Sequence, residues 1–249
     1  MAEALLRTVD LARHFGGLKA VDGVSIDLAP GEIHAVIGPN GAGKSTLINL
    51  LSGDLVPSSG SVLLAGQEIG GSPAWKLARL GIGRSYQRVN IFKELGVGEN
   101  VALAVQARMV VPRELFAPAH RRGDLLERGK EALARAGLGA VDLRRPASAL
   151  AHGEQRQLEI AMTLAMEPRL LLLDEPLAGL GPEESERMVP LLRSLAADHG
   201  VLLVEHDMDV VFTVADRITV MVNGRVLAQG SVEQIRSNQA VRDAYLGDS

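Results

Sequence analysis

The sequence predicts an α/β fold whose central strands are buried on both faces, and three observations support this. Residues 170–173 and 201–204 are continuous apolar runs, a pattern typical of parallel strands covered by helices. A glycine-rich segment, GPNGAGKST at residues 38–46, lies between an apolar run and a helix-compatible stretch. The 249 residues are 47% hydrophobic, which is enough for a substantial core in one or two domains.

The first quarter of the chain predicts short strands separated by turns. Pro30-Gly31 and the cluster at residues 57–60 mark two of these turns. The glycine-rich segment continues into residues 46–51, which are helix-compatible and stop near Gly53. The strand candidates are residues 5–11, 24–28, 32–37 and 61–64.

A helical insertion is expected next, at about residues 88–166. Residues 97–136 within it are helix-compatible, with a break at residues 112–118, which begin and end with proline. The chain then returns to the α/β pattern. A helix is expected over residues 182–198, between the two buried runs.

The last predicted elements form a hairpin. Residues 217–222 and 225–229 flank Asn223-Gly224, which is the strongest short hairpin signal. The chain is therefore expected to hold an α/β core with a helical insertion.

Composition and charge exclude several classes of function. The net charge of −4 gives no electrostatic support for nucleic acid as the main partner. Cysteine is absent, which excludes disulfides and thiolate metal sites and fits a reducing compartment. The first 15 residues include Glu3, Arg7 and Asp10 and no apolar signal core. No apolar stretch approaches the roughly 18 residues of a membrane span.

Residues 38–46, which we call the phosphate loop, fit the pattern G-x-x-x-x-G-K-[ST]. Gly38 and Gly43 let backbone N–H groups turn inward and form an anion-binding nest. Lys44 supplies positive charge for the β- and γ-phosphates, and the Ser45 hydroxyl can ligate Mg²⁺. The positive dipole end of the helix that follows points at the same phosphates. The loop predicts a nucleoside triphosphate site.

Two carboxylates end the buried run LLLLDEP at residues 170–176. Ligands of open α/β sheets bind at this edge, so Asp174 is placed to hold Mg²⁺ and Glu175 to polarise an attacking water. His206 ends another strand, where it could reach the γ-phosphate. Gln87 follows the segment of residues 81–86, and there it could contact the metal or the attacking water. Without the phosphate loop, each of these groups would be an ordinary strand-ending or structural residue.

The order of these motifs resembles the ATP-binding subunit of ABC transporters over essentially the whole chain. The match consists of the phosphate loop, Gln87, LAHGEQ at residues 150–155 (the signature loop), LLLLDEP and His206. The resemblance implies an ABC-type P-loop NTPase, one domain over residues 1–249, with an N-terminal antiparallel β subdomain and the helical insertion. It also implies head-to-tail dimers that enclose two ATP molecules with Mg²⁺.

The resemblance assigns roles residue by residue. Glu175, His206 and Gln87 carry the catalytic role, and Ser45, Gln87 and Asp174 the metal role. One subunit holds ATP with its phosphate loop, and its partner closes the site with the signature loop. The aromatic ring of Phe15 stacks on adenine, a role that rests on the resemblance alone. The nucleotide-binding set is Phe15, Gly38, Pro39, Asn40, Gly41, Ala42, Gly43, Lys44, Ser45, Thr46, Ala151, His152, Gly153 and Glu154.

Finer segments resemble the ATPases of branched-chain amino acid importers and their urea or short-amide relatives. These are residues 158–162, 174–184, 205–212 and 244–247. The resemblance implies an ATP hydrolase at the inner face of the plasma membrane. Its partners would be a second ATP-binding subunit, identical or paralogous, two permeases and, indirectly, a periplasmic binding protein, with no nucleic acid.

The sequence departs from the family pattern at two places, the signature loop and the loop that crosses the dimer interface. Ala151 stands where the family has a serine whose hydroxyl binds the γ-phosphate across the dimer, and Glu154 replaces a glutamine. The Gly153 N–H and the positive end of the helix that follows are left to make that contact. We therefore expect the signature loop to be functional but weakened. Gly181 replaces an aspartate at the dimer interface, which fits an asymmetric heterodimer.

Three alternatives differ in class. An exporter of the lipopolysaccharide type uses a similar ATPase, although residues 205–212 favour the importer. A soluble ABC ATPase of translation or DNA maintenance would carry tandem cassettes or basic linkers. A GTPase would need an Asn-Lys-x-Asp motif, which is absent.

The apolar cluster of residues 89–92 with Leu95 is either a permease-docking surface or internal packing.

Overall fold

The computed structural model describes residues 4–109 and 122–246, and the chain divides into two compact units. The first unit consists of Met1–Arg84, Arg169–Glu175 and Leu192–Ser249. The second consists of Ser85–Pro168 and Pro176–Leu191. The division into one domain with an insertion at residues 88–166 stays a prediction.

The first unit is built on a mixed sheet with the strand order β11-β10-β4-β9-β8-β7. Strand β4 pairs in parallel with β9 and β10, and β8 pairs in parallel with β9. Every residue of β4, β8 and β9 is buried, as the continuous apolar runs predicted. The bounds are β4 Ile33–Ile37, β7 Ile82–Ser85, β8 Leu170–Asp174, β9 Gly200–Val204, β10 Arg217–Val222 and β11 Arg225–Gly230.

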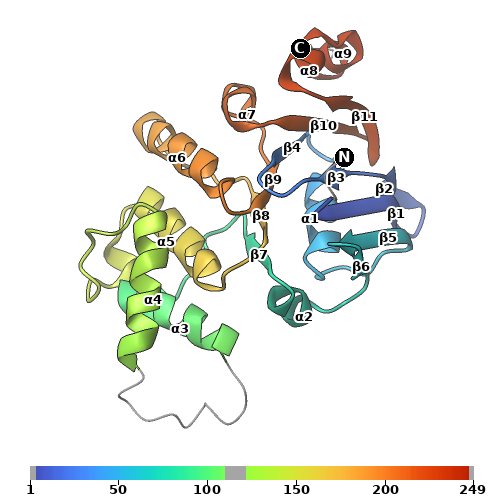
Figure 1. Cartoon of the computed structure of the whole chain (residues 1–249). Coiled ribbons are helices and arrows are strands. Elements are labelled where there is room, and N and C mark those ends of the chain that lie inside the picture. The colour runs from blue at the N-terminus through green and yellow to red at the C-terminus, as the bar shows by residue number, and fades with distance from the viewer. Residues whose placement is uncertain (1–3, 110–121, 247–249) are drawn as a thin grey trace. The chain divides into compact units, whose positions relative to one another are not determined.

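A second, antiparallel sheet confirms the predicted N-terminal β subdomain (Figure 1). Its strand order is β2-β1-β5-β6, and β3 pairs with β1. Helix α1 (Lys44–Leu51) shares one hydrophobic core with both sheets, which includes Leu47, Leu28 and Leu172. The strand bounds are β1 Leu6–Phe15, β2 Leu18–Val24, β3 Asp27–Leu28, β5 Ser59–Leu64 and β6 Gln67–Glu68.

Helices α2, α7, α8 and α9 also belong to the described part of the first unit. Helices α7 and α8 cover the other face of β4 and β10, where Val211, Ile235 and Ile218 form a second core. The hairpin of β10 and β11 turns at Asn223-Gly224, as predicted. The helix bounds are α2 Ala74–Arg79, α7 Met208–Val214, α8 Val232–Ser237 and α9 Gln239–Leu246.

The second unit is helical. Helices α3 (Val97–Met109), α4 (Arg122–Arg135) and α5 (His152–Ala165) pack against one another (Figure 1). A 3-10 turn, Ala147–Ala149, precedes α5. The predicted break at residues 112–118 lies outside the described residues. In the described parts of the chain, no helix is long and apolar enough to cross a membrane.

Several predicted boundaries differ from the structure. The strand expected at residues 5–11 is β1, which runs on to Phe15, and the one expected at residues 61–64 begins at Ser59. One strand was expected at residues 24–28, but β2 ends at Val24 and β3 begins at Asp27. The Thr8 hydroxyl causes this break, because it donates to the Val24 carbonyl and accepts from the Ile26 N–H. The helix expected over residues 182–198 is α6 (Pro182–Leu195), and it ends in a turn at residues 196–199.

Candidate active site

The phosphate loop joins β4 to α1, as the sequence predicted. Gly43 has a φ of 102°, and a Cβ there would lie 2.2 Å from the Ala20 carbonyl oxygen. A Cβ on Gly38 would lie 2.2 Å from the Met221 carbonyl oxygen. Both glycines are therefore required by close backbone approach inside the first unit, in addition to any phosphate contact.

Lys44 lies in the first turn of α1 with its ammonium group turned back into the loop. Its Nζ donates to the carbonyl of Gly38 at 2.6 Å and to that of Pro39 at 3.1 Å. Burial lowers the pKa of Lys44, while the nearby carboxylates of Glu175 and Asp174 oppose that shift. The loop therefore presents a buried cation whose charge faces acidic groups.

Asp174 and Glu175 lie where β8 ends, at the edge reached by β4 and β9. Asp174 pairs in register with Val204 of β9, and the Glu175 N–H donates to the Val204 carbonyl at 2.8 Å. Glu175 has a φ of 49°, a left-handed conformation that costs about 1–3 kcal/mol for a non-glycine residue. Such strain is concentrated at functional sites, which supports a special role for this carboxylate.

Arg84 lies beside Asp174, and the sequence patterns did not predict this contact. Its Nη2 lies 3.4 Å from Asp174 Oδ2, and its Nη1 contacts Asp54 Oδ2 at 2.5 Å and Ser52 Oγ at 2.7 Å. The Arg84 side chain is only 10% exposed. Arg84 of β7 thus links the Asp174 carboxylate to Ser52 and Asp54, which follow α1. The single charged residue of β7, whose sequence is IGRS, was the available sequence signal.

His206 and Phe15 are also in the first unit, and both are accessible. His206 is the second residue after β9, and its side chain is 65% exposed. Its N–H donates to the carboxylate of the buried Glu205 at 3.1 Å, which fixes the backbone beneath the ring. Phe15 ends β1 and is 42% exposed, with the Arg13 guanidinium 4.7 Å above its ring. Phe15 is therefore not a core residue.

The second unit holds Gln87, whose side chain is exposed. Its carbonyl accepts a hydrogen bond from Arg156 of α5 at 2.7 Å. Arg156 is buried and pairs with Glu159, and burial raises the pKa of Glu159 against the opposing charge of Arg156. The sequence analysis did not predict this pair.

The signature loop leads into the first turn of α5. Ala151 is the N-cap residue and provides no side-chain acceptor, although its own N–H donates to Glu154 Oε2 at 2.9 Å. The sequence assigned the Gly153 N–H to a phosphate. In the structure this N–H donates to Glu184 Oε1 at 3.1 Å. Hydrogen bonds from Gly181 and Gly153 lower the pKa of Glu184, so this carboxylate occupies the helix N-terminus as an anion.

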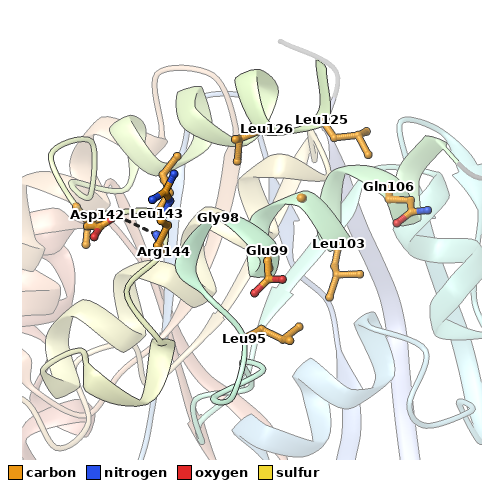
Figure 2. Close-up of a pocket in the computed structure, with 12 residues that line it drawn as sticks. Leu95, Gly98, Glu99, Leu103, Gln106, Leu125, Leu126, Asp142, Leu143 and Arg144 are labelled. Carbon is orange, nitrogen blue, oxygen red and sulfur yellow. Dashed lines mark hydrogen bonds between the residues drawn. The ribbon is translucent and has the colours of Figure 1, made fainter. Parts of the chain in front are cut away.

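A groove of about 780 Å³ lies in the second unit, between α3, α4 and residues 141–144. Figure 2 shows Leu126 of α4 above α3, with Leu95, Glu99 and Leu103 on the other side. The groove is mainly apolar, and charged groups such as Glu99 and Arg144 lie on its lining.

The donor set of the first unit fits Mg²⁺. Among residues 4–109 and 122–246, no three His, Cys, Asp or Glu side chains form a metal cage. Ser45 is exposed in the first turn of α1, and Asp174 supplies a carboxylate from β8. Mg²⁺ typically takes one or two such protein oxygens and completes its shell with phosphate oxygens and water.

Comparison with known proteins agrees with this geometry. A family model described as ABC transporter matches residues 21–178, and one described as branched-chain amino acid ATP-binding cassette transporter matches residues 225–249. The chain is 42% identical over 256 residues to the high-affinity branched-chain amino acid transport ATP-binding protein LivG of Escherichia coli K12. It is 42% identical over 260 residues to the corresponding protein BraF of Pseudomonas aeruginosa. Both alignments cover 100% of each chain.

Solved structures give the same result. The crystal structure of the ADP conformation of an ATP-binding cassette of an ABC transporter superposes with a TM-score of 0.87 at 31% identity, covering 98% of this chain and 99% of that one. A nucleotide-free ATP-binding cassette gives a TM-score of 0.85 at 30% identity, covering 97% and 98%. The chain therefore belongs to the ABC transporter family, as an ATP-hydrolysing cassette subunit.

Proposed function

We propose that this chain energises the import of branched-chain amino acids by hydrolysing ATP. The observation that carries the proposal is full-length identity of 42% to LivG, together with the branched-chain family match at residues 225–249. The predicted resemblance of residues 205–212 to importer ATPases points the same way. No feature of the described residues favours the exporter or the soluble ATPase, and both remain outcomes of the test below.

The proposed chemistry assigns each group of the first unit one task. The phosphate loop binds the β- and γ-phosphates through backbone N–H groups and Lys44. Ser45 and Asp174 would hold a Mg²⁺, which would supply charge neutralisation at those phosphates. Gln87 of the second unit stays the predicted further oxygen donor. Glu175 accepts the proton of the attacking water. Phosphoryl transfer needs little besides positioning and charge neutralisation, so these groups suffice.

His206 and Phe15 complete the proposed nucleotide site. The exposed His206 ring contacts the γ-phosphate, because the buried Glu205 fixes its backbone at the end of β9. Phe15 offers an exposed aromatic face on which adenine stacks.

A second subunit has to close the site. The Ala151-Gly153 turn contacts the phosphate of a partner subunit's ATP, and Glu184 has to yield the Gly153 N–H when it does so. We propose a dimer of ATP-binding subunits, two permeases and a periplasmic binding protein, with this chain on the inner face of the membrane. A paralogous partner with a serine in its signature would compensate for Ala151.

Permease docking is proposed on the second unit. Phe92 is 54% exposed, and the buried Asn100 side chain fixes its backbone through bonds to its N–H at 2.8 Å and its carbonyl at 3.0 Å. Such a rigid, exposed ring suits a permease helix. Leu95 extends the apolar surface into the groove of Figure 2. A pull-down with the cognate permease that survives Phe92→Asp would remove this docking site.

The test is reconstitution in liposomes with the neighbouring permeases, the binding protein and any second ATPase. ATP inside the vesicles should drive accumulation of labelled leucine, isoleucine or valine, and Lys44→Ala should abolish it. ATP-dependent movement of a lipid instead would support the exporter. Robust ATP hydrolysis with no binding to any permease would support a soluble ATPase. Either of these results would contradict the proposal.

A further inference from the structure

The turn of the β10–β11 hairpin contacts both the phosphate loop and strand β2, inside the first unit. The Gly224 N–H donates to the Ala42 carbonyl of the phosphate loop at 3.0 Å. The Gly224 carbonyl accepts from the Asp22 N–H of β2 at 2.8 Å. Gly224 has a φ of 79°, and a Cβ there would lie 2.6 Å from the Lys19 carbonyl oxygen. Glycine at this position therefore lets the hairpin turn join the phosphate loop to β2.

Arg225, the residue after this turn, makes an ion pair with Asp22. Its Nε and Nη2 donate to Asp22 Oδ2 at 2.9 Å and 2.6 Å. These hydrogen bonds lower the pKa of Asp22, so the carboxylate stays ionised at neutral pH. Asp22 Oδ1 lies 3.6 Å from Nε2 of His14 in β1. Asp22 is thus held by the hairpin through both its backbone and its side chain.

Strands β1 and β2 form the ribbon that carries Phe15. The pairing of β1 with β5 ends at Ala12, three residues before Phe15, while the pairing with β2 continues to the tip of the ribbon. On the β5 side, the His14 N–H still reaches Ser58 Oγ at 3.1 Å. On the β2 side, the attachment is the hairpin turn with the pair of Asp22 and Arg225.

Stability is a weak reason for this ion pair. The Arg225 side chain is 68% exposed, and an exposed pair adds little to the stability of a fold. What the pair does provide is direction, because two N–H groups of one guanidinium converge on one carboxylate oxygen. It fixes the place of β2 against the hairpin that also contacts the phosphate loop.

We propose that Asp22 and Arg225 are positioning residues for the nucleotide base, which hold the ribbon that carries Phe15 in place against the phosphate loop. This assignment rests on the proposed functions of Phe15 and of the phosphate loop in binding adenine and phosphates. One nucleotide spans both, so the ring contributes to affinity only where the bound phosphates place the base. A group held in position before the ligand arrives costs less to order on binding. The pair therefore strengthens binding of the base and leaves binding of the phosphates unaffected.

The experiment compares two ligands on the isolated full-length chain with Mg²⁺, by titration calorimetry. ATP has a base, whereas tripolyphosphate has the phosphates alone. Phe15→Ala should weaken ATP binding by about tenfold, the effect of losing an aromatic ring that stacks on a base. Arg225→Met should weaken ATP binding by about threefold and leave the Kd of tripolyphosphate native. In the Phe15→Ala background, Arg225→Met should have no further effect on ATP, because the pair acts through the ring.

The matched control is Arg217→Met. Arg217 lies in the same hairpin, but its guanidinium donates to Gln229 of β11 at 3.2 Å rather than to β2. Its loss removes the same charge and should leave both Kd values native. Asp22→Asn removes the other charge of the pair with little change in shape, and it should weaken ATP binding as Arg225→Met does. Arg225→Lys keeps the charge without the two-pronged donor, and its Kd for ATP should lie between the two.

Three results would overturn the inference. Equal losses for ATP and tripolyphosphate would mean that Arg225 acts on the phosphates through its charge. Native ATP affinity in both Arg225→Met and Asp22→Asn, or additive losses in the double variant with Phe15→Ala, would also overturn it. Native ATP affinity in Phe15→Ala would remove the proposed role of Phe15, and the inference with it. A failure of the proposed import function would appear only in the liposome assay, on which no Kd here depends.

Discussion

Ala151→Ser tests how the signature loop works, because the N-cap position of α5 is already built for a serine. Ala151 has φ −61° and ψ 161°, the extended conformation of a normal N-cap residue, and lacks a side-chain acceptor. Its N–H already donates to Glu154 Oε2, which is half of a capping box. A serine hydroxyl would accept from the Glu154 N–H and complete the box.

The expected magnitude follows from these contacts. A serine in place of alanine at an N-cap stabilises a protein by about 1 kcal/mol. For a chain of this size, that raises the Tm of the isolated subunit by about 2–4 °C. In the assembled transporter, the hydroxyl also gains a bond to the partner's γ-phosphate, worth about 1.5–3 kcal/mol. If it forms in the transition state, ATPase turnover should rise by about tenfold or more.

Thermal unfolding of the subunit and steady-state ATPase of the transporter measure the two effects separately. Ala149→Ser is the control, because Ala149 is exposed just before the loop and caps no helix. It should change neither quantity. A higher Tm with an unchanged turnover would refute the cross-dimer role of position 151, and an unchanged Tm would refute the capping geometry.

Three other predictions concern the first unit. His34 is fully buried between the Asp27 carbonyl and Thr219, and burial lowers its pKa to about 4. Since only the unfolded chain takes up the proton below about pH 6.5, the free energy of unfolding from this group should fall by about 2 kcal/mol from pH 7 to pH 5. In His34→Gln, denaturant titrations at pH 7 and pH 5 should show no such fall in the free energy of unfolding. An unaltered pH dependence of that free energy would contradict the assignment. Gly43→Ala should cost at least about 2 kcal/mol of stability and abolish nucleotide binding. In Gly41→Ala the added Cβ meets no atom within 4 Å, so this control should cost about 1 kcal/mol. Equal effects of the two variants would argue against the clash with the Ala20 carbonyl. Arg84→Met should destabilise the chain by about 3 kcal/mol, because it leaves Asp174 without its cation. It should also weaken Mg²⁺-dependent ATP binding more than Arg84→Lys does. Equal losses of binding in the two variants would show that the charge of Arg84 is irrelevant to Asp174.

Much of the fold follows from local patterns. The buried runs at residues 170–173 and 201–204 form β8 and β9, and Asn223-Gly224 forms the hairpin turn. These predictions succeed because period, apolar continuity and turn chemistry act over a few neighbouring residues. The break between β2 and β3 was missed because it depends on the Thr8 side chain, which bonds backbone 16 and 18 residues away.

In the candidate site, too, local patterns predict some residues and not others. The phosphate loop and the carboxylates after β8 carry spaced motifs, and so they could be found from the sequence. Their supporting contacts could not. Arg84 meets Asp174 across 90 residues, Arg156 meets Tyr86 across 70, and Glu184 meets Gly153 across 31. No local pattern encodes such pairs, because the folded chain brings them together.

The central claim is that Glu175 is the base of an ATPase site built by the phosphate loop and Asp174. The most direct measurement is single-turnover ATP hydrolysis by the assembled transporter carrying Glu175→Gln, compared with the native complex. The glutamine keeps the size of the side chain and removes its charge. With Glu175→Gln we expect bound ATP to stay intact, with hydrolysis nearly abolished and nucleotide affinity retained. Near-normal hydrolysis would show that another group accepts the proton, and would contradict the account.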